Sequence, residues 1–426
     1  MQVATPTTII ISRKQKVLVR GDVWKNVRRL GRGAHGAVWL RQRVRYKGTA
    51  GTAATAATSL SPDMFAFKRM ANMMRDHAKS RQCLRELQFA TTLCHPNIVT
   101  HHRIHCQSRQ SGVYLQMEAM STSLAERSVS SEACLGDEQV RYLIYQLLCS
   151  VNYLHSGGIL HRDIKPQNLL VNDDNTLKLC DMGLACYVPH AATLPADAQH
   201  TQHTQQMEPH VQTRWYRAPE VVLLDPHYGT SADIWSCGAV LGDLFEMQLR
   251  ARGQRRPLFP GRFCYPLSPQ PQPPNAHCTA DTDQLRVILD ALPPLTREDV
   301  ASVRNPIGKS MLQQQQQQTL SSAKPQTPSL VQRFHGVNPQ ALDLLHHMLH
   351  FQPQQRWTAA QCLAHPYFAP VRREFHREMT YAHIAHDEEA IQCFCFQCTE
   401  SRPLSFADTK TALEYHVQND NPNLDG

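Results

Sequence analysis

The sequence predicts an α+β protein of two lobes, a small antiparallel β-sheet lobe with one main helix and a larger, mainly α-helical lobe. From Trp24 to Met117 the patterns are short and strand-like, with one helical stretch among them. After Met120 the patterns lengthen into helices. At 426 residues the chain can form two domains or one bilobal unit with insertions. We therefore expect two lobes with a cleft between them.

Changes in composition set the expected boundaries. Along the chain these are a flexible basic tail (1–22), the small lobe (23–118), the large lobe with proline-rich and glutamine-rich insertions (119–370) and a C-terminal extension (371–426). In the small lobe, Tyr46–Asp63 is rich in Ala, Thr and Gly and lacks apolar periodicity, so a loop insertion is expected. In the large lobe, the proline-rich Tyr265–Thr282 and the glutamine run Gln313–Gln318 are expected to lack regular structure.

Two helices are predicted by periodicity. The segment RDHAKSRQCLRELQFATTLC carries Leu84, Leu87 and Ala90 at helical spacing. In the large lobe, EQVRYLIYQLLCSVNYLHSGG has one apolar stripe, which consists of Val140, Leu143, Ile144, Leu147, Leu148 and Val151. Gly157 and Gly158 follow that stripe and predict the end of the helix.

Composition argues against several classes of protein. Hydrophobic content of 42% and charged content of 19% are typical of a folded chain. No apolar run approaches about 18 residues, and the start of the chain lacks the basic region of a secretion signal, so neither a membrane span nor export is expected. The net charge is +8, but no Lys/Arg block is interleaved with aromatic residues, so a basic surface is favoured over nucleic-acid binding. The 14 cysteines are scattered, as in a reduced intracellular compartment.

The first candidate site is the glycine-rich segment LGRGAHGAVWL. Gly31, Gly33 and Gly36, followed by Val38, form a G-x-G-x-x-G-x-V pattern between two strand-like patterns. Glycines allow a hairpin backbone to approach phosphates that a side chain would block. A simple glycine-rich turn is the alternative.

The second candidate is a lysine in the strand-like segment MFAFKRM. Strand alternation places Ala66 and Lys68 on one face, opposite Phe65 and Phe67. Glu86 follows in the first predicted helix. A Lys68–Glu86 pair between strand and helix would hold the ammonium group against two phosphates, whereas a solvent-exposed lysine is the simpler interpretation.

The third and fourth candidates are two loops with carboxylates. In HRDIKPQN, Asp163 is followed by Lys165 and Asn168, and in LKLCDMGLA, Asp181 follows a strand-like run. These groups together can orient a hydroxyl, neutralise a transferring phosphoryl group and ligate Mg²⁺. Taken singly, each has a structural explanation such as a capping Asp or an exposed Lys.

In this order, the four clusters and the later APE resemble the eukaryotic protein kinase signature, from about Trp24 to Phe368. DIKPQN is similar to serine/threonine kinases, and TRWYRAPE, RPLFPGR and MLHFQPQQRWTAAQCLAHPYF are similar to mitogen-activated protein kinases. The resemblance implies a protein kinase fold and a proline-directed kinase that transfers the ATP γ-phosphate to Ser or Thr of proteins.

The resemblance also implies roles for single residues. Asp163 would orient the substrate hydroxyl, Lys165 would steady the γ-phosphate, Asn168 and Asp181 would hold Mg²⁺, and Lys68, fixed by Glu86, would position the α- and β-phosphates. The nucleotide would further contact Gly31, Gly33, Gly36, Val38, Ala66, Glu118 and Met120, with Met117 as the gatekeeper. Asp233 would support the catalytic loop, and Glu220 would pair with Arg356.

The activation segment departs from the family. Its Thr-x-Tyr motif is absent, and the corresponding places hold Glu208 and His210. Of three arginines that would grip the phosphothreonine, Arg85 and Arg162 are present, while Cys186 occupies the third place. We hypothesise that Glu208 replaces the phosphothreonine and pairs with these two arginines.

Two other interpretations of this segment stay open. In the first, Glu208 is a plain exposed loop residue. In the second, Thr201 or Thr204 is the phosphorylated residue on a lengthened loop. Arg214 and Arg217, which would grip a phosphotyrosine, face His210 in this alignment. Met182 replaces the phenylalanine of the D-F-G motif and is expected to keep an apolar packing role.

Several functional alternatives stay open as well. The chain could be a kinase-fold scaffold or pseudokinase with little phosphotransfer, or a cyclin-dependent-like kinase. The expected partners are proteins with Ser/Thr-Pro sites, and an upstream kinase is possible as a further partner. Neither nucleic acid nor a membrane is expected as a partner. The protein is expected to be a monomer. The expected location is the cytoplasm, with the nucleus open. Cys393, Cys395 and Cys398 could bind zinc, but free or buried thiols are favoured because the spacing is not a strong zinc motif.

Overall fold

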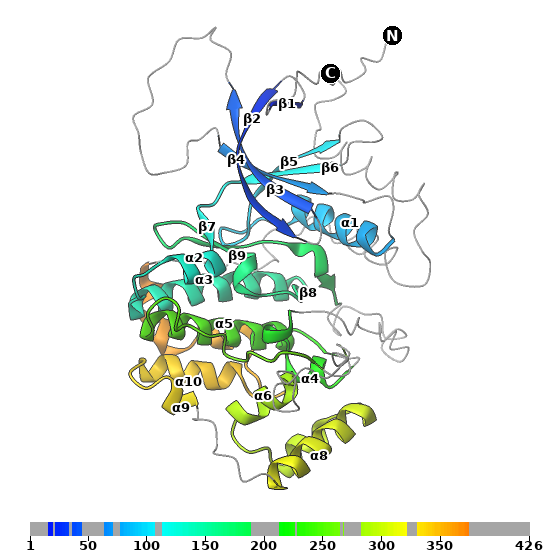
Figure 1. Cartoon of the computed structure of the whole chain (residues 1–426), viewed down its shortest axis with the longest axis vertical. Helices are drawn as coiled ribbons and strands as arrows, with labels where there is room; N and C mark the ends of the chain where they lie inside the picture. Colours follow the sequence, from blue (N-terminus) through cyan, green and yellow to red (C-terminus); the bar gives the residue numbers. More distant parts are fainter. Residues whose placement is uncertain are drawn as a thin grey trace. The chain divides into compact units, whose positions relative to one another are not determined.

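The computed structural model describes residues 16–19, 22–33, 36–44, 64–70, 77–106, 113–188, 213–225, 228–264, 267, 283–321 and 330–374. It confirms the expected α+β architecture, with an antiparallel sheet in the N-terminal part and a helical C-terminal part (Figure 1). The described residues cluster into two compact units. Unit 1 holds those up to Ser121 together with Asp181–Gly183, and unit 2 holds Thr122–Cys180 and those from Leu184 onward.

Unit 1 is a six-stranded antiparallel sheet in the order β1-β2-β3-β4-β6-β5. The strands are β1 (Lys16–Val19), β2 (Asp22–Gly33), β3 (Gly36–Val44), β4 (Met64–Met70), β5 (His101–Cys106) and β6 (Val113–Glu118). The predicted helix is α1 (His77–Thr92), which packs on one face, where Leu84 and Leu87 meet Met70 and Leu115 in a buried cluster.

The opposite face of this sheet has its own aromatic core. Trp24 lies edge-on to Phe65 and Phe67, with ring centroids 5.6 and 4.9 Å apart. Because successive residues of a strand point to opposite sides, alternation along β4 supplies side chains to both faces of the sheet.

The expected flexible tail is partly wrong. Lys16–Val19, within residues 1–22, is β1, and it pairs antiparallel with residues 22–25 of β2. The sequence KVLV combines β-branched and apolar residues, which favour a strand once a neighbouring strand is available. The prediction of a flexible tail was based on the basic character of residues 1–22 and did not weigh the strand preference of KVLV. The other domain boundaries stay predictions.

Unit 2 is built around two long helices, α3 (Asp137–Ser156) and α5 (Ser231–Leu249). The predicted stripe of α3 is confirmed, because all six of its apolar residues are buried, and Gly157 caps the helix as expected. The other helices are α2 (Leu124–Ser130), α4 (Pro219–Val222), α6 (Gln284–Ala291), α7 (Arg297–Ser302), α8 (Pro306–Ser321), α9 (Leu330–Arg333), α10 (Pro339–Met348), α11 (Ala359–Leu363) and α12 (Ala369–Glu374).

Short strands and 3₁₀ turns hold the loops of unit 2. The strands are β7 (Thr122–Ser123), β8 (Ile159–Leu160), β9 (Leu169–Val171), β10 (Leu177–Leu179) and β11 (Cys186–Tyr187). The 3₁₀ turns are η1 (Pro166–Asn168), η2 (Met182–Leu184), which begins in unit 1, η4 (Arg214–Tyr216) and η6 (Pro366–Phe368). β7, β9 and β10 form one sheet, and β8 pairs with β11.

The glutamine run was expected to lack regular structure, and this expectation is wrong. Gln313–Gln318 lies within α8. Glutamine is a good helix former, and the start of α8 is well capped, because the Asn305 side chain accepts hydrogen bonds from the backbone N–H groups of Ile307 and Gly308. A helix with a strong start can therefore continue through a segment without apolar periodicity.

Gly308 allows α8 to approach the end of α4. A Cβ at this position would lie 2.1 Å from the carbonyl oxygen of Leu223, which is too close for any real contact. We expect Gly308→Ala to lower the free energy of unfolding by about 1–3 kcal/mol, because a backbone carbonyl cannot move aside cheaply. Gly229→Ala is the control, since nothing lies within 4 Å of a Cβ there. Equal urea midpoints for the two variants would contradict this prediction.

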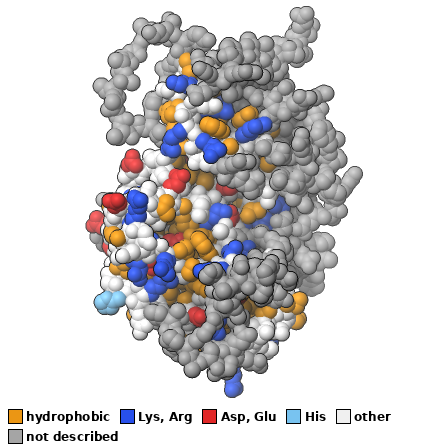
Figure 2. Space-filling model, viewed as in Figure 1, with side chains coloured by type: hydrophobic (Ala, Val, Ile, Leu, Met, Phe, Trp, Pro, Cys, Tyr) orange, Lys and Arg blue, Asp and Glu red, His pale blue; other side chains and the backbone are white. Residues whose placement is uncertain are grey.

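Figure 2 shows one face of the described part of the surface. On the face drawn in Figure 2, Lys and Arg side chains are interspersed with acidic and hydrophobic ones rather than gathered in one block. No helix in the described part of the chain is long and apolar enough to span a membrane.

Candidate active site

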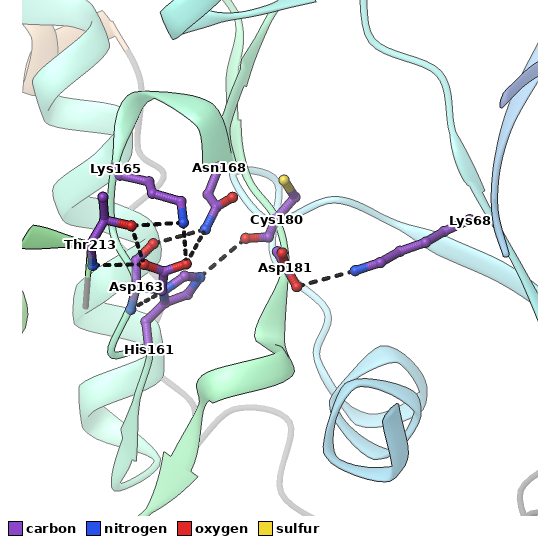
Figure 3. A network of polar contacts seen from close by, with 8 residues as sticks. All are labelled: Lys68, His161, Asp163, Lys165, Asn168, Cys180, Asp181 and Thr213. Carbon is purple, nitrogen blue, oxygen red and sulfur yellow. Dashed lines mark hydrogen bonds and ion pairs between the residues drawn. The ribbon is translucent and has the colours of Figure 1, made fainter. Parts of the chain in front are cut away.

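Unit 1 contains a buried polar group formed by a lysine and two carboxylates. Lys68 Nζ lies 2.5 Å from Glu86 Oε1 on α1. It also lies 3.1 Å from Asp181 Oδ1, a contact that Figure 3 shows. The alternation of β4 turns Lys68 to the same face as Met70, which is the face covered by α1. The strand–helix pair predicted from the sequence is therefore formed.

The charge of Lys68 is maintained despite its burial. Burial alone would lower the pKa of this ammonium group, but the charges of Asp181 and Glu86 outweigh that effect and raise the pKa above its usual value. Lys68 is thus a fixed cation with hydrogen-bond donors held in place by two acceptors. Such a group can bind an anionic ligand without first being protonated.

The glycine-rich segment is a β-hairpin. Gly31 pairs with Val38, and Gly33 pairs with Gly36 at the end of β2 and β3. A bulge between Arg29 and Gly31 shifts the register just before the glycines. The pairing thus brings Gly31, Gly33 and Gly36 to the end of an antiparallel strand pair.

Other residues expected near a nucleotide lie on the neighbouring strands. Ala66 is the cross-strand partner of Met117, and Glu118 ends β6. The backbone N–H of Glu118 donates to the Thr100 carbonyl at 3.0 Å, and Met120 is buried two residues later. These contacts fix the segment after β6.

Unit 2 contains the second polar group, which is centred on Asp163. Its carboxylate accepts hydrogen bonds from Lys165 Nζ at 2.5 Å and from Asn168 Nδ2 at 3.1 Å. Thr213 donates to the other oxygen from its backbone N–H at 3.2 Å and from its hydroxyl at 3.0 Å (Figure 3). Asp163, Lys165 and Asn168 were predicted to converge, and they do.

The sequence interpretation did not assign a role to Thr213. Its hydroxyl also lies 2.9 Å from Lys165 Nζ, so it contacts both the ammonium group of Lys165 and the carboxylate of Asp163. The available signal was its place as the first residue of TRWYRAPE. Sequence alone could not show that this residue, 50 positions after Asp163, returns to the same loop.

Asp233 on α5 holds the loop that carries Asp163, as predicted. Its carboxylate accepts hydrogen bonds from the backbone N–H groups of His161 at 2.8 Å and Arg162 at 2.9 Å, and it contacts His155 Nε2 at 3.0 Å. Burial would raise the pKa of Asp233, but these contacts outweigh it and lower the pKa. Arg162 takes φ 63°, a left-handed conformation that these hydrogen bonds stabilise.

The loop also contacts the segment before Asp181. His161 Nε2 lies 3.1 Å from the carbonyl oxygen of Cys180, and the Cys180 N–H donates to the Asn168 carbonyl. The Asn168 amide donates its nitrogen to Asp163, so its oxygen is the atom left to meet a cation. Amide and carboxylate oxygens are the ligands that Mg²⁺ prefers, so the side chains of Asn168 and of Asp181 are each of a type that suits this ion.

The turn η4, directly after Thr213, is anchored to α5 and the loop beyond it. Trp215 Nε1 donates to the Gly261 carbonyl at 2.9 Å, and the Tyr216 hydroxyl donates to Asp243 Oδ2 at 2.6 Å. Asp243 Oδ1 accepts from the Leu258 N–H at 3.2 Å. These contacts fix the position of Thr213.

Asp243 gives this anchor a pH dependence. Burial raises its pKa from 3.8 to about 7, although the hydrogen bonds from Tyr216 and Leu258 and the charge of Arg333 oppose that rise. Because the folded state binds the proton more tightly, the stabilising contribution is complete below about pH 4 and is lost as the pH rises through 7.

We therefore expect Asp243→Asn to gain stability relative to the wild-type protein by about 2–3 kcal/mol between about pH 5 and pH 8. The amide resembles the protonated acid and does not ionise. Urea unfolding at several pH values measures the difference. Asp173→Asn, at an exposed turn, is the control, and parallel pH profiles for all three proteins would contradict the assignment.

The arginines expected to regulate the protein already have protein partners where the structure describes them. Arg162 Nε donates to the Leu184 carbonyl at 2.6 Å, and Arg214 donates to the carbonyls of Gly261 and Arg262. Arg217 is buried beside Cys264. Arg85 is half-buried on α1.

The regulatory hypothesis itself stays a prediction. Glu208, His210, Thr201 and Thr204 lie outside the described residues. The C-terminal cysteines lie outside them as well, and the described residues contain no group of three or more His, Cys, Asp or Glu side chains suited to a metal ion.

The pairing of Glu220 with Arg356 is confirmed. Arg356 Nη1 lies 2.7 Å from Glu220 Oε1 and Nη2 lies 3.0 Å from Oε2, in a buried bidentate ion pair. Arg356 also donates to the carbonyls of Ser231, His350 and Phe351. The pair joins the segment after η4 to the loop before α11.

Comparison with known proteins identifies the family. Residues 46–257 match the protein kinase domain. Mitogen-activated protein kinase 4 of Oryza sativa subsp. japonica is 33% identical over 353 residues, which cover 81% of this chain and 78% of that protein. The chain belongs to the mitogen-activated protein kinase family.

Other relatives extend this finding. Mitogen-activated protein kinase 2 of Arabidopsis thaliana is 32% identical, over 76% of this chain and 75% of its own length. Mitogen-activated protein kinase 15 of Xenopus laevis is 31% identical, over 80% of this chain and 49% of its own length. The chain is thus a protein serine/threonine kinase by family, and the polar groups around Lys68 and Asp163 are those expected of such an enzyme. ATP as a substrate, protein substrates and upstream kinases are general features of this family.

Proposed function

We propose that this kinase transfers the γ-phosphate of Mg·ATP to serine or threonine residues that precede a proline. The observation that best supports catalysis is the Asp163 network, in which Lys165, Asn168 and Thr213 all donate to one carboxylate. The Lys68–Glu86–Asp181 group is likewise formed. Both polar groups would serve the same reaction.

Each residue has a proposed task. Asp163 accepts the proton of the substrate hydroxyl, and Lys165 steadies the γ-phosphate. Thr213 keeps the carboxylate of Asp163 in place. Lys68 positions the α- and β-phosphates, and Glu86 restricts its movement. Asn168 and Asp181 would hold Mg²⁺, which supplies positive charge against the phosphate oxygens.

Nucleotide binding involves further residues of unit 1. The glycines Gly31, Gly33 and Gly36 would cover the phosphates, and Val38, Ala66, Glu118 and Met120 would border the base. These assignments combine the hairpin geometry of β2 and β3 with the family pattern.

The deciding experiment is phosphotransfer by bacterially expressed, phosphatase-treated protein. It uses Mg·ATP and a library of Ser/Thr peptides with and without a following proline, and Asp181→Ala provides the background. Incorporation above that background, with preference for proline, would support the proposal. Nucleotide binding without phosphotransfer would favour a kinase-fold scaffold, and a requirement for an added cyclin-like subunit would favour a cyclin-dependent type of enzyme.

We also propose that Glu208 replaces the activating phosphate and pairs with Arg85 and Arg162. Glu208→Ala should then lower kcat of the phosphatase-treated protein by about tenfold or more, because a charge-assisted pair that orders the segment is lost. Glu208→Asp is expected to restore part of the activity. Unchanged turnover in Glu208→Ala would leave the two other interpretations, in which Glu208 is a plain exposed loop residue or Thr201 or Thr204 is the phosphorylated residue.

The remaining proposals concern the state of the protein in the cell. We infer a monomer in the cytoplasm, with entry to the nucleus open, and protein substrates with Ser/Thr-Pro sites. Light scattering measures the oligomeric state, and a fluorescent fusion measures the location. An upstream kinase is indicated if incubation with a cell extract and ATP raises activity in the wild-type protein.

A further inference from the structure

The outer face of the sheet in unit 1, which lies opposite α1, carries arginines and aromatic side chains together. Residues opposite each other in an antiparallel pair share a face, so the strand register assigns side chains to it. One row across five strands consists of Arg29, Trp39, Phe67, Gln116 and Arg103. The row has an arginine at each end, and at the usual strand spacing these ends are about 19 Å apart.

Three further rows extend the same pattern. They pair Trp24 with Arg43, Arg41 with Phe65, and Arg69 with Tyr114. Glu118, opposite Phe65, is the acid of these rows, and its carboxylate accepts the backbone N–H of Thr100 at 2.6 Å. In the four rows, five arginines and five aromatic rings thus accompany one carboxylate. The outer face is therefore both cationic and aromatic.

Several of these cations are open to solvent. Arg29, Arg69 and Arg103 are exposed, and within the described part of the chain their side chains form no hydrogen bond or ion pair. Trp39 and Tyr114 are half-buried, so their rings keep part of their surface in contact with solvent. A ligand that approaches the outer face can therefore reach free guanidinium groups and aromatic rings at the same time.

The centre of the outer face holds a buried arginine. The guanidinium group of Arg41 lies over the rings of Phe67 and Tyr114, 4.8 and 5.2 Å from their centroids. Its Nε donates to Asn26 Oδ1 at 2.8 Å, whereas Nη1 is buried and lacks a hydrogen-bond partner in the described part of the chain. Arg41 thus adds positive charge beneath the exposed arginines and holds the two rings in place.

The strand register also explains why the sequence did not indicate this surface. Nucleic acid was not expected as a partner, because no block of Lys and Arg is interleaved with aromatic residues along the chain. Successive residues of a strand point to opposite faces, so a sheet interleaves side chains across strands and not along them. The arginines and rings of the outer face come from β2, β3, β4, β5 and β6.

We propose that the outer face binds single-stranded nucleic acid, with the exposed arginines on the phosphates and the half-buried rings stacked on bases. Proteins that bind single strands combine a positively charged surface with aromatic side chains in this way. A peptide with acidic residues would be attracted by the arginines alone, and the rings therefore favour a nucleic acid. The proposal does not depend on the proposed function, because Lys68 lies on the other face of the sheet.

The first test measures fluorescence anisotropy of labelled thymidine and uridine oligomers of about twelve nucleotides with the full-length protein. Arg29→Gln/Arg69→Gln/Arg103→Gln should weaken binding about tenfold or more at low salt. It should also reduce the slope of log affinity against log salt by about 2, since each phosphate contact on a single strand contributes about 0.7. Binding of the DNA or of the RNA oligomer supports the proposal, and the tighter one identifies the sugar.

The matched control is Arg256→Gln/Arg297→Gln/Arg304→Gln. These arginines of unit 2 are also exposed, and their side chains likewise form no hydrogen bond or ion pair within the described ranges. The control removes the same net charge, so its affinity should stay within about threefold of the wild-type value. Equal weakening in the two triple variants would overturn the proposal, because binding would then follow overall charge and not the outer face.

The second test separates base stacking from attraction to any polyanion. An abasic oligomer of the same length keeps the phosphates, and the wild-type protein should bind it at least about fivefold more weakly than the complete oligomer. Trp39→Leu should weaken binding of the complete oligomer by a similar factor, and Trp39→Phe should restore most of it. Equal affinity for the abasic oligomer, or for an acidic peptide of equal charge, would overturn the proposal in favour of a general anion-binding or protein-binding surface.

The comparison of oligomers needs only the wild-type protein, so it remains decisive if Trp39→Leu fails to fold. Absence of binding to all oligomers at low salt would also overturn the proposal.

Discussion

Asp163→Asn should lower kcat of phosphotransfer by about 10²–10⁴-fold, because the amide cannot accept the proton of the substrate hydroxyl. The substitution keeps the shape of the side chain. It also keeps one oxygen, which can accept the hydrogen bonds that Lys165 and Asn168 now donate to a single carboxylate oxygen at 2.5 and 3.1 Å. The fold should therefore survive, and affinity for a fluorescent ATP analogue should change by less than about threefold. Steady-state kinetics and nucleotide titration give the two quantities.

The control for this prediction is Asp174→Asn, at an exposed turn of the same unit. Asp174 Oδ1 accepts the Thr176 N–H, a hydrogen bond that the amide oxygen can also accept. Its kcat should match the wild-type value. If Asp163→Asn retained kcat within about threefold, the general base would have to be another group, and the Asp163 network would be a structural device for positioning Thr213.

The polar residues of the site could be predicted because their spacing is local. Asp163, Lys165 and Asn168 lie within six consecutive positions, so one loop brings them together whatever the rest of the chain does. The pairing of Lys68 with Glu86 needed only strand alternation and one helix. Such local patterns follow from the regular geometry of a strand, a helix or a short loop, so they can be read from the spacing of residues in the sequence.

The residues that the sequence did not reveal act over long separations. Thr213 reaches Asp163 from 50 positions away, and Tyr216 reaches Asp243 from 27 positions away. No periodicity connects such positions, because their contact depends on how η4 packs against α5. The arginines and rings of the outer face were missed for a related reason, since the pairing of five strands brings them together.

Two errors in the expected fold have the same origin. β1 is a strand because a partner strand lies beside it, and α8 continues through the glutamine run because Asn305 caps its start. In both cases the segment lacks a strong pattern of its own. Its structure is decided by a neighbour, which composition does not describe.

Arg356→Met should lower the free energy of unfolding by about 3–5 kcal/mol, which is the usual cost of leaving a buried carboxylate without its partner. The side chains of Arg356 and Glu220 are 0% and 4% exposed, so solvent cannot replace the lost contact. The substitution also removes the donors to Ser231 and His350. Urea denaturation measures the change, and Arg297→Met, at the exposed start of α7, should stay within about 0.5 kcal/mol of the wild-type protein.

The double variant Glu220→Gln/Arg356→Met decides why the single variant is destabilised. If the cost comes mainly from the unpaired carboxylate, the double variant should be more stable than Arg356→Met alone, because a neutral amide is easier to bury. If the double variant is equally or less stable, the cost comes from the carbonyls of Ser231, His350 and Phe351, which lose the same donors in both proteins. The first result would show that the ion pair acts mainly by neutralising Glu220. The second would show that Arg356 acts as a clamp between the start of α5 and the loop before α11, with the ion pair as a secondary contribution.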